Sequence, residues 1–228
     1  MKSRIMLALV AVAAVVAAVT IYFIVQPSLS PTLATRATPV AGASSAPATP
    51  ASNSDLMTAG PLGDRTLGDP KAPNVVIEYG ALTCPHCQRF ATEVFPEFKK
   101  KYIDTGKVYF IFREFPLNQV DQVAIMLARC VPADRYFAVV DLLYQRQNDW
   151  AFVDKPQDAL RGLLKQVGLS QDSFDACLKD QNVLNGVNWV KNNATDKLGV
   201  EATPTFFING KKVEGEQTLA EIDKILAG

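Results

Sequence analysis

Histidine and cysteine are scarce in this chain, which holds one histidine and four cysteines among 228 residues. Charge of one sign is not in excess either, because 23 basic side chains balance 23 acidic ones. No basic stripe with interleaved aromatic residues occurs, so nucleic acid is not expected as a partner. Four cysteines is an even number, which indicates disulfides in an exported protein and metal binding or catalysis in the cytosol.

Residues 1–26 have the pattern of a membrane signal. Lys2 and Arg4 precede an uncharged, mostly apolar run from Ile5 to Val25. Such a run, about 21 residues long, can cross a bilayer and exceeds the usual apolar core of a signal peptide. We interpret it as an uncleaved signal anchor, with a cleaved signal peptide as the alternative. The positive flank stays cytoplasmic, so the rest of the chain is expected to be periplasmic or extracytoplasmic. It would be tethered to the cytoplasmic membrane, or soluble in the periplasm after cleavage.

Residues 27–60 are rich in Pro, Ala, Ser and Thr and contain few large apolar side chains after Leu33. A segment of this composition cannot bury enough apolar surface to offset the entropy of ordering. We expect a disordered, flexible tether between the membrane and a folded domain.

The remaining residues, 61–228, suffice for one domain with a substantial core. Periodicity and turn residues predict a β-α-β unit, a helical block, and a β-β-α unit. The predicted ranges are a strand at 74–79, a helix at 85–104 interrupted at Pro96, a strand at 107–114, five helices between 120 and 197, strands at 205–208 and 211–214 joined by Asn209-Gly210, and a helix at 219–226.

Two cysteines and the only histidine occur together in Cys84-Pro85-His86-Cys87, directly after the first strand and its loop. Proline suits the first position of a helix, so Cys84 is expected at a helix N-terminus. The helix dipole and free N–H groups there stabilise a thiolate, and a protonated His86 would add positive charge. Stabilising the thiolate favours the dithiol and makes the disulfide a stronger oxidant. The motif therefore predicts a redox centre with Cys87 as the resolving thiol.

Other readings of the motif remain open but are less well supported. A c-type haem site requires histidine after the second cysteine, and Gln88 stands there. A zinc site requires about four ligands, which Cys130 and Cys177 could complete. Both lie in helical patterns without a second Cys-x-x-Cys, and an inert disulfide at this short spacing is uncommon. No metal is expected.

The element order and the Cys-Pro-His-Cys motif resemble the thioredoxin superfamily, and within it the DsbA-like thiol-disulfide oxidoreductases. The resemblance covers roughly residues 65–228 and implies a thioredoxin fold of α/β class with an all-helical insertion at about 118–197. It also implies that Cys84 exchanges with substrate and that Cys87 closes a redox-active Cys84–Cys87 disulfide. No cofactor is needed, because the cysteines carry the two electrons.

Two further positions gain meaning from this resemblance. Glu78 is an acidic side chain at a strand end facing water, or, as in DsbA-like proteins, a buried carboxylate that relays a proton near Cys87. Pro204 opens a strand, and the matching proline of the superfamily is cis and faces the two cysteines. We therefore expect a cis Thr203–Pro204 bond. Thr203 departs from the valine of the best-known DsbA oxidase and is shared with isomerase-type relatives, which leaves the direction of exchange open.

Cys130 and Cys177 both fall in helices of the expected insertion. In an oxidising compartment we expect a structural disulfide between them, as some DsbA-like relatives have. Separate buried thiols and zinc ligation are the alternatives.

These features predict an enzyme, an extracytoplasmic protein thiol-disulfide oxidoreductase that introduces disulfides into exported proteins. Its expected partners are reduced or misoxidised exported proteins, a membrane redox partner, and the inner membrane through the N-terminal segment. A monomer is expected. The alternatives are a reductase or isomerase working from the dithiol form, and a peptide-binding, chaperone-like module that uses the cysteines little.

Overall fold

The computed structural model describes residues 53–227, and its centre is a five-stranded mixed sheet in the order β1-β3-β2-β4-β5. The neighbours β2 and β3 run parallel, and the other pairs are antiparallel. The strands are β1 (Arg65–Leu67), β2 (Asn74–Gly80), β3 (Val108–Glu114), β4 (Thr205–Ile208) and β5 (Lys211–Glu214).

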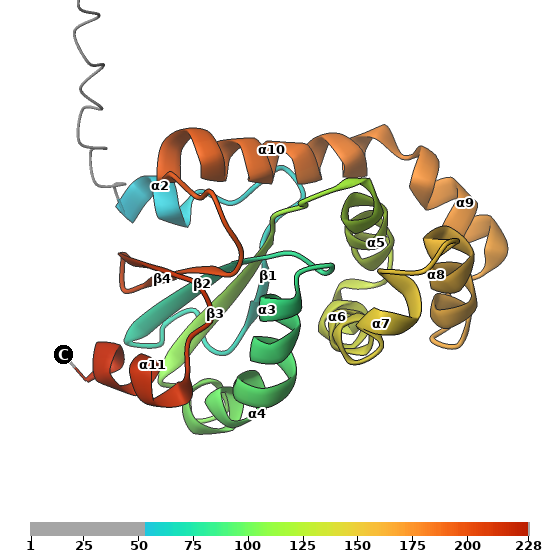
Figure 1. Ribbon diagram of the computed structural model, residues 1–228. Coiled ribbons are helices and arrows are strands. Elements are labelled where there is room, and N and C mark those ends of the chain that lie inside the picture. Colours follow the sequence, from blue (N-terminus) through green and yellow to red (C-terminus); the bar gives the residue numbers. More distant parts are fainter. Residues whose placement is uncertain (1–52, 228) are drawn as a thin grey trace, which may run out of the picture. The chain divides into compact units, whose positions relative to one another are not determined.

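Helices cover both faces of this sheet (Figure 1). One face carries α10 (Gln181–Leu198) and α2 (Asn53–Met57), and the other carries the helical run that begins at α3 (Pro85–Arg89), together with α11 (Leu219–Leu226). Side chains alternate across a strand, so adjacent phenylalanines of β4 enter opposite cores. Phe206 packs with the α3 side, and Phe207 packs with the α10 side.

The helical run from Pro85 to Ile103 is continuous but changes its hydrogen-bond spacing at the expected proline. It comprises α3, the π-helical segment η1 (Phe90–Val94), α4 (Phe95–Phe98) and the π-helical segment η2 (Lys99–Ile103). Pro96 has no N–H to donate. In the turn before it, the N–H of Phe95 donates to the carbonyl of Phe90, five residues back. The interruption predicted at Pro96 is therefore a pair of wide turns rather than a break.

A block of helices joins β3 to β4, and Figure 1 shows α5 to α9 beside the sheet, next to α3. All five helices predicted here are present. Two short elements, η3 and α7, were not predicted. The block contains α5 (Gln119–Arg129), η3 (Ala133–Arg135), α6 (Tyr136–Gln145), α7 (Gln147–Trp150), α8 (Pro156–Lys165), α9 (Gln171–Lys179) and α10.

The N-terminal boundary of the folded domain needs correction. The tether was expected to reach residue 60, yet residues 53–57 form α2, and the side chain of Leu56 is only 3% exposed. The Leu56 carbonyl accepts a hydrogen bond of 2.7 Å from Arg113 of β3. The short strand β1 was not predicted either. Both elements are too short to form alone and depend on contacts with distant residues.

The expected signal anchor at 1–26 and the tether up to residue 52 lie outside the described residues. Within the part that the structure describes, no helix is both long and apolar enough to cross a membrane.

Candidate active site

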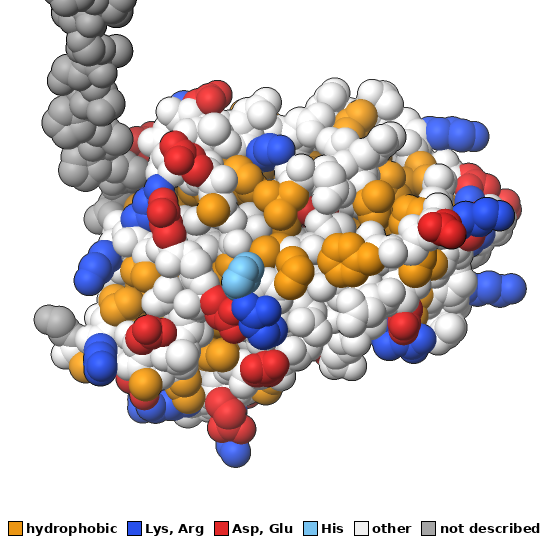
Figure 2. All heavy atoms as spheres, in the orientation of Figure 1, with side chains coloured by type: hydrophobic (Ala, Val, Ile, Leu, Met, Phe, Trp, Pro, Cys, Tyr) orange, Lys and Arg blue, Asp and Glu red, His pale blue; other side chains and the backbone are white. Residues whose placement is uncertain are grey.

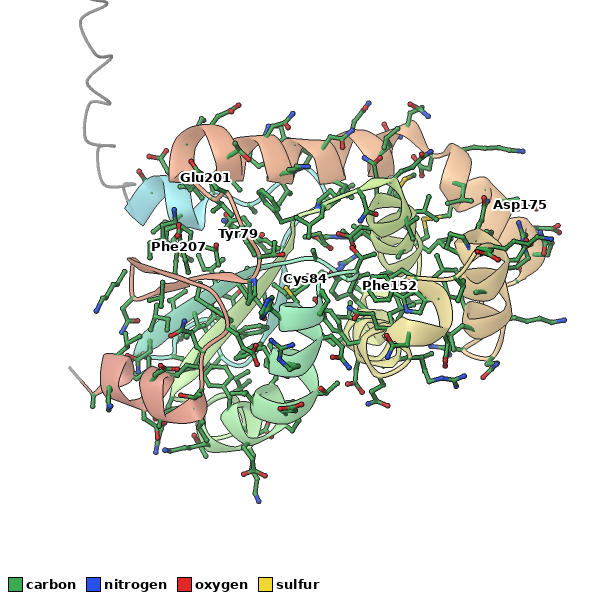
Figure 3. All side chains as sticks on the ribbon, viewed as in Figure 1. Tyr79, Cys84, Phe152, Asp175, Glu201 and Phe207 are labelled. Carbon is green, nitrogen blue, oxygen red and sulfur yellow. A yellow bond between two sulfur atoms is a disulfide. The ribbon has the colours of Figure 1, made fainter. Side chains whose placement is uncertain are left out.

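Cys84 is the N-cap residue of α3 and directly precedes Pro85, the first residue of the helix. Figure 3 shows it at the start of α3. The loop from β2 ends here, and the backbone N–H groups of His86 and Cys87, in the first helical turn, donate to the Cys84 sulfur. Cys84 and Cys87 are both free thiols in the structure.

The surroundings of the Cys84 sulfur lower its pKa from 9.0 to about 5. The largest cause is a hydrogen bond from Cys87, followed by opposing desolvation, a side-chain hydrogen bond from Thr203, and the backbone N–H groups of Cys87 and His86. Each of these donors favours the charged form, because a thiolate accepts hydrogen bonds more strongly than a thiol. Cys84 is thus a thiolate at neutral pH.

Cys87 has the opposite character. Its side chain is fully buried, and desolvation, first among the causes, raises its pKa well above 9.0. The nearby charges of Glu78 and Cys84 add to this rise. Within one motif, one sulfur is therefore held as a thiolate and the other as a thiol, which suits an attacked sulfur and a resolving sulfur.

Glu78 lies near the end of β2, between Phe112 of β3 and Phe206 of β4. It is 3% exposed, and burial followed by the charge of Cys84 raises its pKa from 4.5 to about 8. Its Oε1 is buried without a hydrogen-bond partner among the described residues. Glu78 is therefore the buried carboxylate of the two alternatives and does not face water. The carboxyl is mostly neutral at pH 7 and able to donate a proton.

Glu78 lines a cavity of about 310 Å³. Aromatic and aliphatic side chains form most of its wall, and Lys99 and Asp141 also line it. A water molecule occupies about 30 Å³ in the liquid, so this space can hold several.

The Thr203–Pro204 bond is cis, as the resemblance led us to expect. The carbonyl oxygen of Thr203 lies 3.4 Å from the Cys84 sulfur, which donates to it when protonated. The Thr203 hydroxyl is buried without a hydrogen-bond partner among the described residues, and its closeness to the Cys84 sulfur lowers the pKa of that thiol. The loop before β4 thus faces Cys84 with both a backbone acceptor and a side-chain donor.

His86 contributes to the site in a way that the sequence did not reveal. Its backbone N–H, not its ring, is among the causes that lower the Cys84 pKa. The ring is 60% exposed, and its Nδ1 lies 2.6 Å from Nη2 of Arg89 and 3.3 Å from Oε2 of Glu216. Arg89 and Glu216 are themselves paired at 2.7 Å. These two residues were not predicted. Arg89 lies one turn after His86, but Glu216 is far away in sequence.

The other two cysteines form a disulfide between the C-cap of α5 and helix α9, with Cα atoms of Cys130 and Cys177 6.0 Å apart. Both sulfurs are thus bonded to each other, so the structure contains neither the separate thiols nor the zinc ligands considered as alternatives for this pair.

Sheet order, N-capping cysteine, buried partner thiol and cis proline together define a protein of the thioredoxin class with a dithiol centre. The comparisons with known proteins agree. A family model described as thioredoxin matches residues 62–227. The solved structure of alpha-DsbA1 from Wolbachia pipientis is 35% identical with a TM-score of 0.69, and the match covers 76% of this chain and 96% of that one. The solved structure of BdbD from Bacillus subtilis shares the fold. It is 24% identical with a TM-score of 0.63, and the match covers 72% of this chain and 94% of that one.

A Rickettsia bellii protein named "Putative protein-disulfide oxidoreductase" is 32% identical over 167 residues, which are 72% of this chain and 64% of that protein. The match spans just under two thirds of this relative's length. The chain belongs to the thioredoxin superfamily and, within it, to the DsbA-like thiol-disulfide oxidoreductases. The predicted fold, a thioredoxin fold with a helical insertion, is confirmed.

Proposed function

We propose that the protein introduces disulfides into exported proteins by dithiol–disulfide exchange at Cys84 and Cys87. The observation that carries the proposal is the lowered pKa of Cys84, about 5, beside a Cys87 whose pKa is raised. A stabilised thiolate makes the dithiol form the favoured one, so the oxidised pair readily takes two electrons from a substrate.

In the proposed reaction, a substrate thiolate attacks the Cys84 sulfur of the Cys84–Cys87 disulfide. A substrate–Cys84 bond forms, the Cys84–Cys87 bond breaks, and Cys87 leaves as a thiolate that takes up a proton. A second substrate thiolate then attacks its own partner sulfur in the mixed disulfide and releases Cys84 as a thiolate. The substrate loses two electrons and the cysteine pair gains them.

Glu78 supplies and recovers the proton of Cys87 in this scheme. With a pKa near 8, the carboxyl is protonated when Cys87 leaves, and it can take the proton back when the pair is reoxidised. The cavity behind it supports the role, since solvent water there can restore the protonation state of a carboxyl that lacks protein partners.

Substrate peptides bind beside the cis peptide bond, where the backbone of Thr203 faces Cys84. An extended peptide can pair with such a segment like an added strand. In Figure 2, hydrophobic side chains lie above and to the right of the pale blue histidine, His86. An apolar surface around the reactive thiolate suits unfolded proteins, which expose their own apolar side chains.

A reductase or isomerase is the second candidate, and Thr203 is the observation that favours it. The low pKa of Cys84 favours the oxidase instead, because it stabilises the product of substrate oxidation. In the same proposal, residues 1–26 anchor the protein in the cytoplasmic membrane with the domain outside. A membrane redox partner reoxidises the cysteine pair there.

A trapping experiment tests the proposed function. The Cys87→Ala variant lacks the thiol that resolves a mixed disulfide at Cys84. When its Cys84 is activated with an oxidant and incubated with a reduced, unfolded substrate protein, we expect a mixed disulfide to accumulate and to be visible on a non-reducing gel. The Cys84→Ala/Cys87→Ala variant is the matched control. Failure to trap any adduct, together with no substrate oxidation by the wild-type protein, would refute the proposal. If residues 1–26 anchor the protein, the intact N-terminus is expected in the membrane fraction, and the domain is expected to be labelled by a reagent added from outside.

A further inference from the structure

The loop that carries Cys84 is held by the helical insertion rather than by the sheet alone. We call residues Ala81–Cys84 the active-site loop. Asp121, in the first turn of α5, is fully buried, and its Oδ1 accepts hydrogen bonds from the N–H groups of Leu82 at 2.8 Å and Thr83 at 3.1 Å. Its Oδ2 accepts from the N–H of Leu117 at 2.9 Å. One carboxylate therefore joins the active-site loop to the chain that enters the insertion.

Gln147, the first residue of α7, holds the same loop from its carbonyl side. It is 3% exposed, and its Nε2 donates to the carbonyl oxygens of Leu82 at 2.8 Å and Cys84 at 3.1 Å. Tyr144 of α6 adds a weaker bond of 3.3 Å to the carbonyl of Ala81. Four backbone groups of Leu82, Thr83 and Cys84 thus find partners on two insertion side chains.

These bonds bear directly on the reactive sulfur. The Cys84 pKa depends on short-range donors from the first turn of α3 and from Thr203, and such contacts persist only while the Cα of Cys84 is fixed. A buried backbone group that loses its partner is costly, so the loop would shift to recover one if either side chain were removed. The insertion is therefore mechanically coupled to the thiolate.

We propose that Asp121 and Gln147 are positioning residues for Cys84, through which the helical insertion sets the equilibrium between the dithiol and the disulfide. The proposal rests on the proposed exchange at Cys84–Cys87. It adds to that site two residues that lie in the helical insertion. The two residues act with opposite sign. The Gln147 amide donates to the carbonyl oxygen of Cys84 and fixes that residue in place, whereas Asp121 carries a negative charge that interacts unfavourably with the Cys84 thiolate.

The test is the equilibrium constant of the cysteine pair with glutathione, together with the thiolate absorbance of Cys84 against pH. Gln147→Met keeps the length of the side chain and removes both donors. We expect its disulfide to be about tenfold more stable against glutathione, and its Cys84 to titrate at higher pH. The reason is that the dithiol form, whose thiolate depends on the position of the loop, would lose about one hydrogen bond's free energy relative to the disulfide form. Asp121→Asn keeps the shape and removes the charge, and we expect an opposite shift of about threefold.

Gln122→Leu is the matched control. Gln122 is the neighbour of Asp121 on α5 and bonds to Asn188 of α10, away from the loop. Its variant is expected to stay within twofold of wild type in the glutathione equilibrium, even if it unfolds more easily.

The outcomes separate a positioning role from a structural one. Loss of stability in Gln147→Met with the equilibrium constant and the Cys84 titration unchanged would overturn the proposal, as would shifts of equal sign in Gln147→Met and Asp121→Asn. If Gln147→Met does not fold, Gln147→Glu is expected to shift the titration in the same direction. The Cys84 titration needs no substrate, so failure of the trapping experiment would reject the proposed function without deciding this one.

Discussion

The two cysteine pairs of this protein differ little in burial and have opposite chemistry. Cys84, Cys87 and Cys177 are 5%, 0% and 3% exposed, and Cys130 is partly buried, so the reactive pair is the more buried of the two. The pair at α3 consists of free thiols, and one of them receives hydrogen bonds from the helix N-terminus and Thr203. The insertion pair is bonded and joins two helices. Reactivity therefore follows from the donors aimed at the sulfur, and the two pairs should respond differently to every perturbation below.

The largest expected effect is the loss of exchange when the attacked sulfur is removed. Cys84→Ser should reduce the oxidation rate of a reduced substrate protein by at least about 10³-fold, because a hydroxyl cannot form the mixed disulfide. The Cys130→Ser/Cys177→Ser variant should keep its rate within about threefold. A comparable loss in both variants would mean that the insertion disulfide takes part in the chemistry.

The insertion disulfide should matter for stability instead. It closes a loop with a sequence separation of 47, and its removal should lower the free energy of unfolding by about 4 kcal/mol on the chain-entropy model. Urea unfolding of Cys130→Ser/Cys177→Ser against the wild type measures this difference. An unchanged unfolding midpoint would show that the bond does not hold α5 to α9.

Breaking the Cys84–Cys87 disulfide by reduction should raise the free energy of unfolding, whereas removing the insertion disulfide should lower it. Folding lowers the Cys84 pKa from 9.0 to about 5, which raises the free energy of unfolding of the dithiol form. This stabilisation is present in full above pH 9 and is lost as the pH falls through 5. With allowance for solvent screening, the gain at pH 7 is about 1–3 kcal/mol. Unfolding of the selectively reduced and the oxidised protein, compared at pH 5 and pH 7, checks it. A gain that persists at pH 5 would contradict the thiolate as its cause.

Glu78→Gln should be more stable and slower than the wild type. A carboxyl with a folded pKa raised to about 8 favours folding in full below pH 4.5, and that contribution is lost as the pH rises through 8. Glutamine does not titrate, so the variant should gain about 1–3 kcal/mol at pH 7 and nothing at pH 4. Exchange should slow about tenfold for lack of a proton relay. Glu93→Gln, on the same side of the sheet but not buried, should change neither quantity.

The smallest effect is expected at the loop opposite Cys84. Thr203→Val removes a hydroxyl that lowers the Cys84 pKa, so that pKa should rise by less than about one unit from its value near 5. The pH midpoint of alkylation by iodoacetamide measures it. Thr92→Val removes a hydroxyl that bonds to the Gln88 carbonyl instead and should leave the midpoint in place.

Elements whose stability is local could be predicted from the sequence. The turn Asn209-Gly210 has positive φ at both residues, as its hairpin requires, and Thr218 caps the N-terminus of α11 through a capping box with Glu221. In contrast, α2 and β1 depend on contacts with distant residues, such as the bond from Arg113 to Leu56, and no local pattern marks them.

The same division applies to the site. Cys84, Cys87 and Pro204 are recognisable because the motif and the fold place them. The partners Asp121, Gln147 and Glu216 are 37 or more positions away from Cys84 in sequence and carry no signature. Only the packing of the insertion against the loop brings the first two to it.

The reduction potential of the Cys84–Cys87 pair, measured by equilibration with glutathione, tests the central claim most directly. A thiolate stabilised by helix donors and Thr203 predicts a potential well above the roughly −270 mV of thioredoxin and toward the roughly −120 mV of a strong oxidant. A value at or below that of thioredoxin would contradict the oxidase account, because the dithiol would then not be the stabilised form.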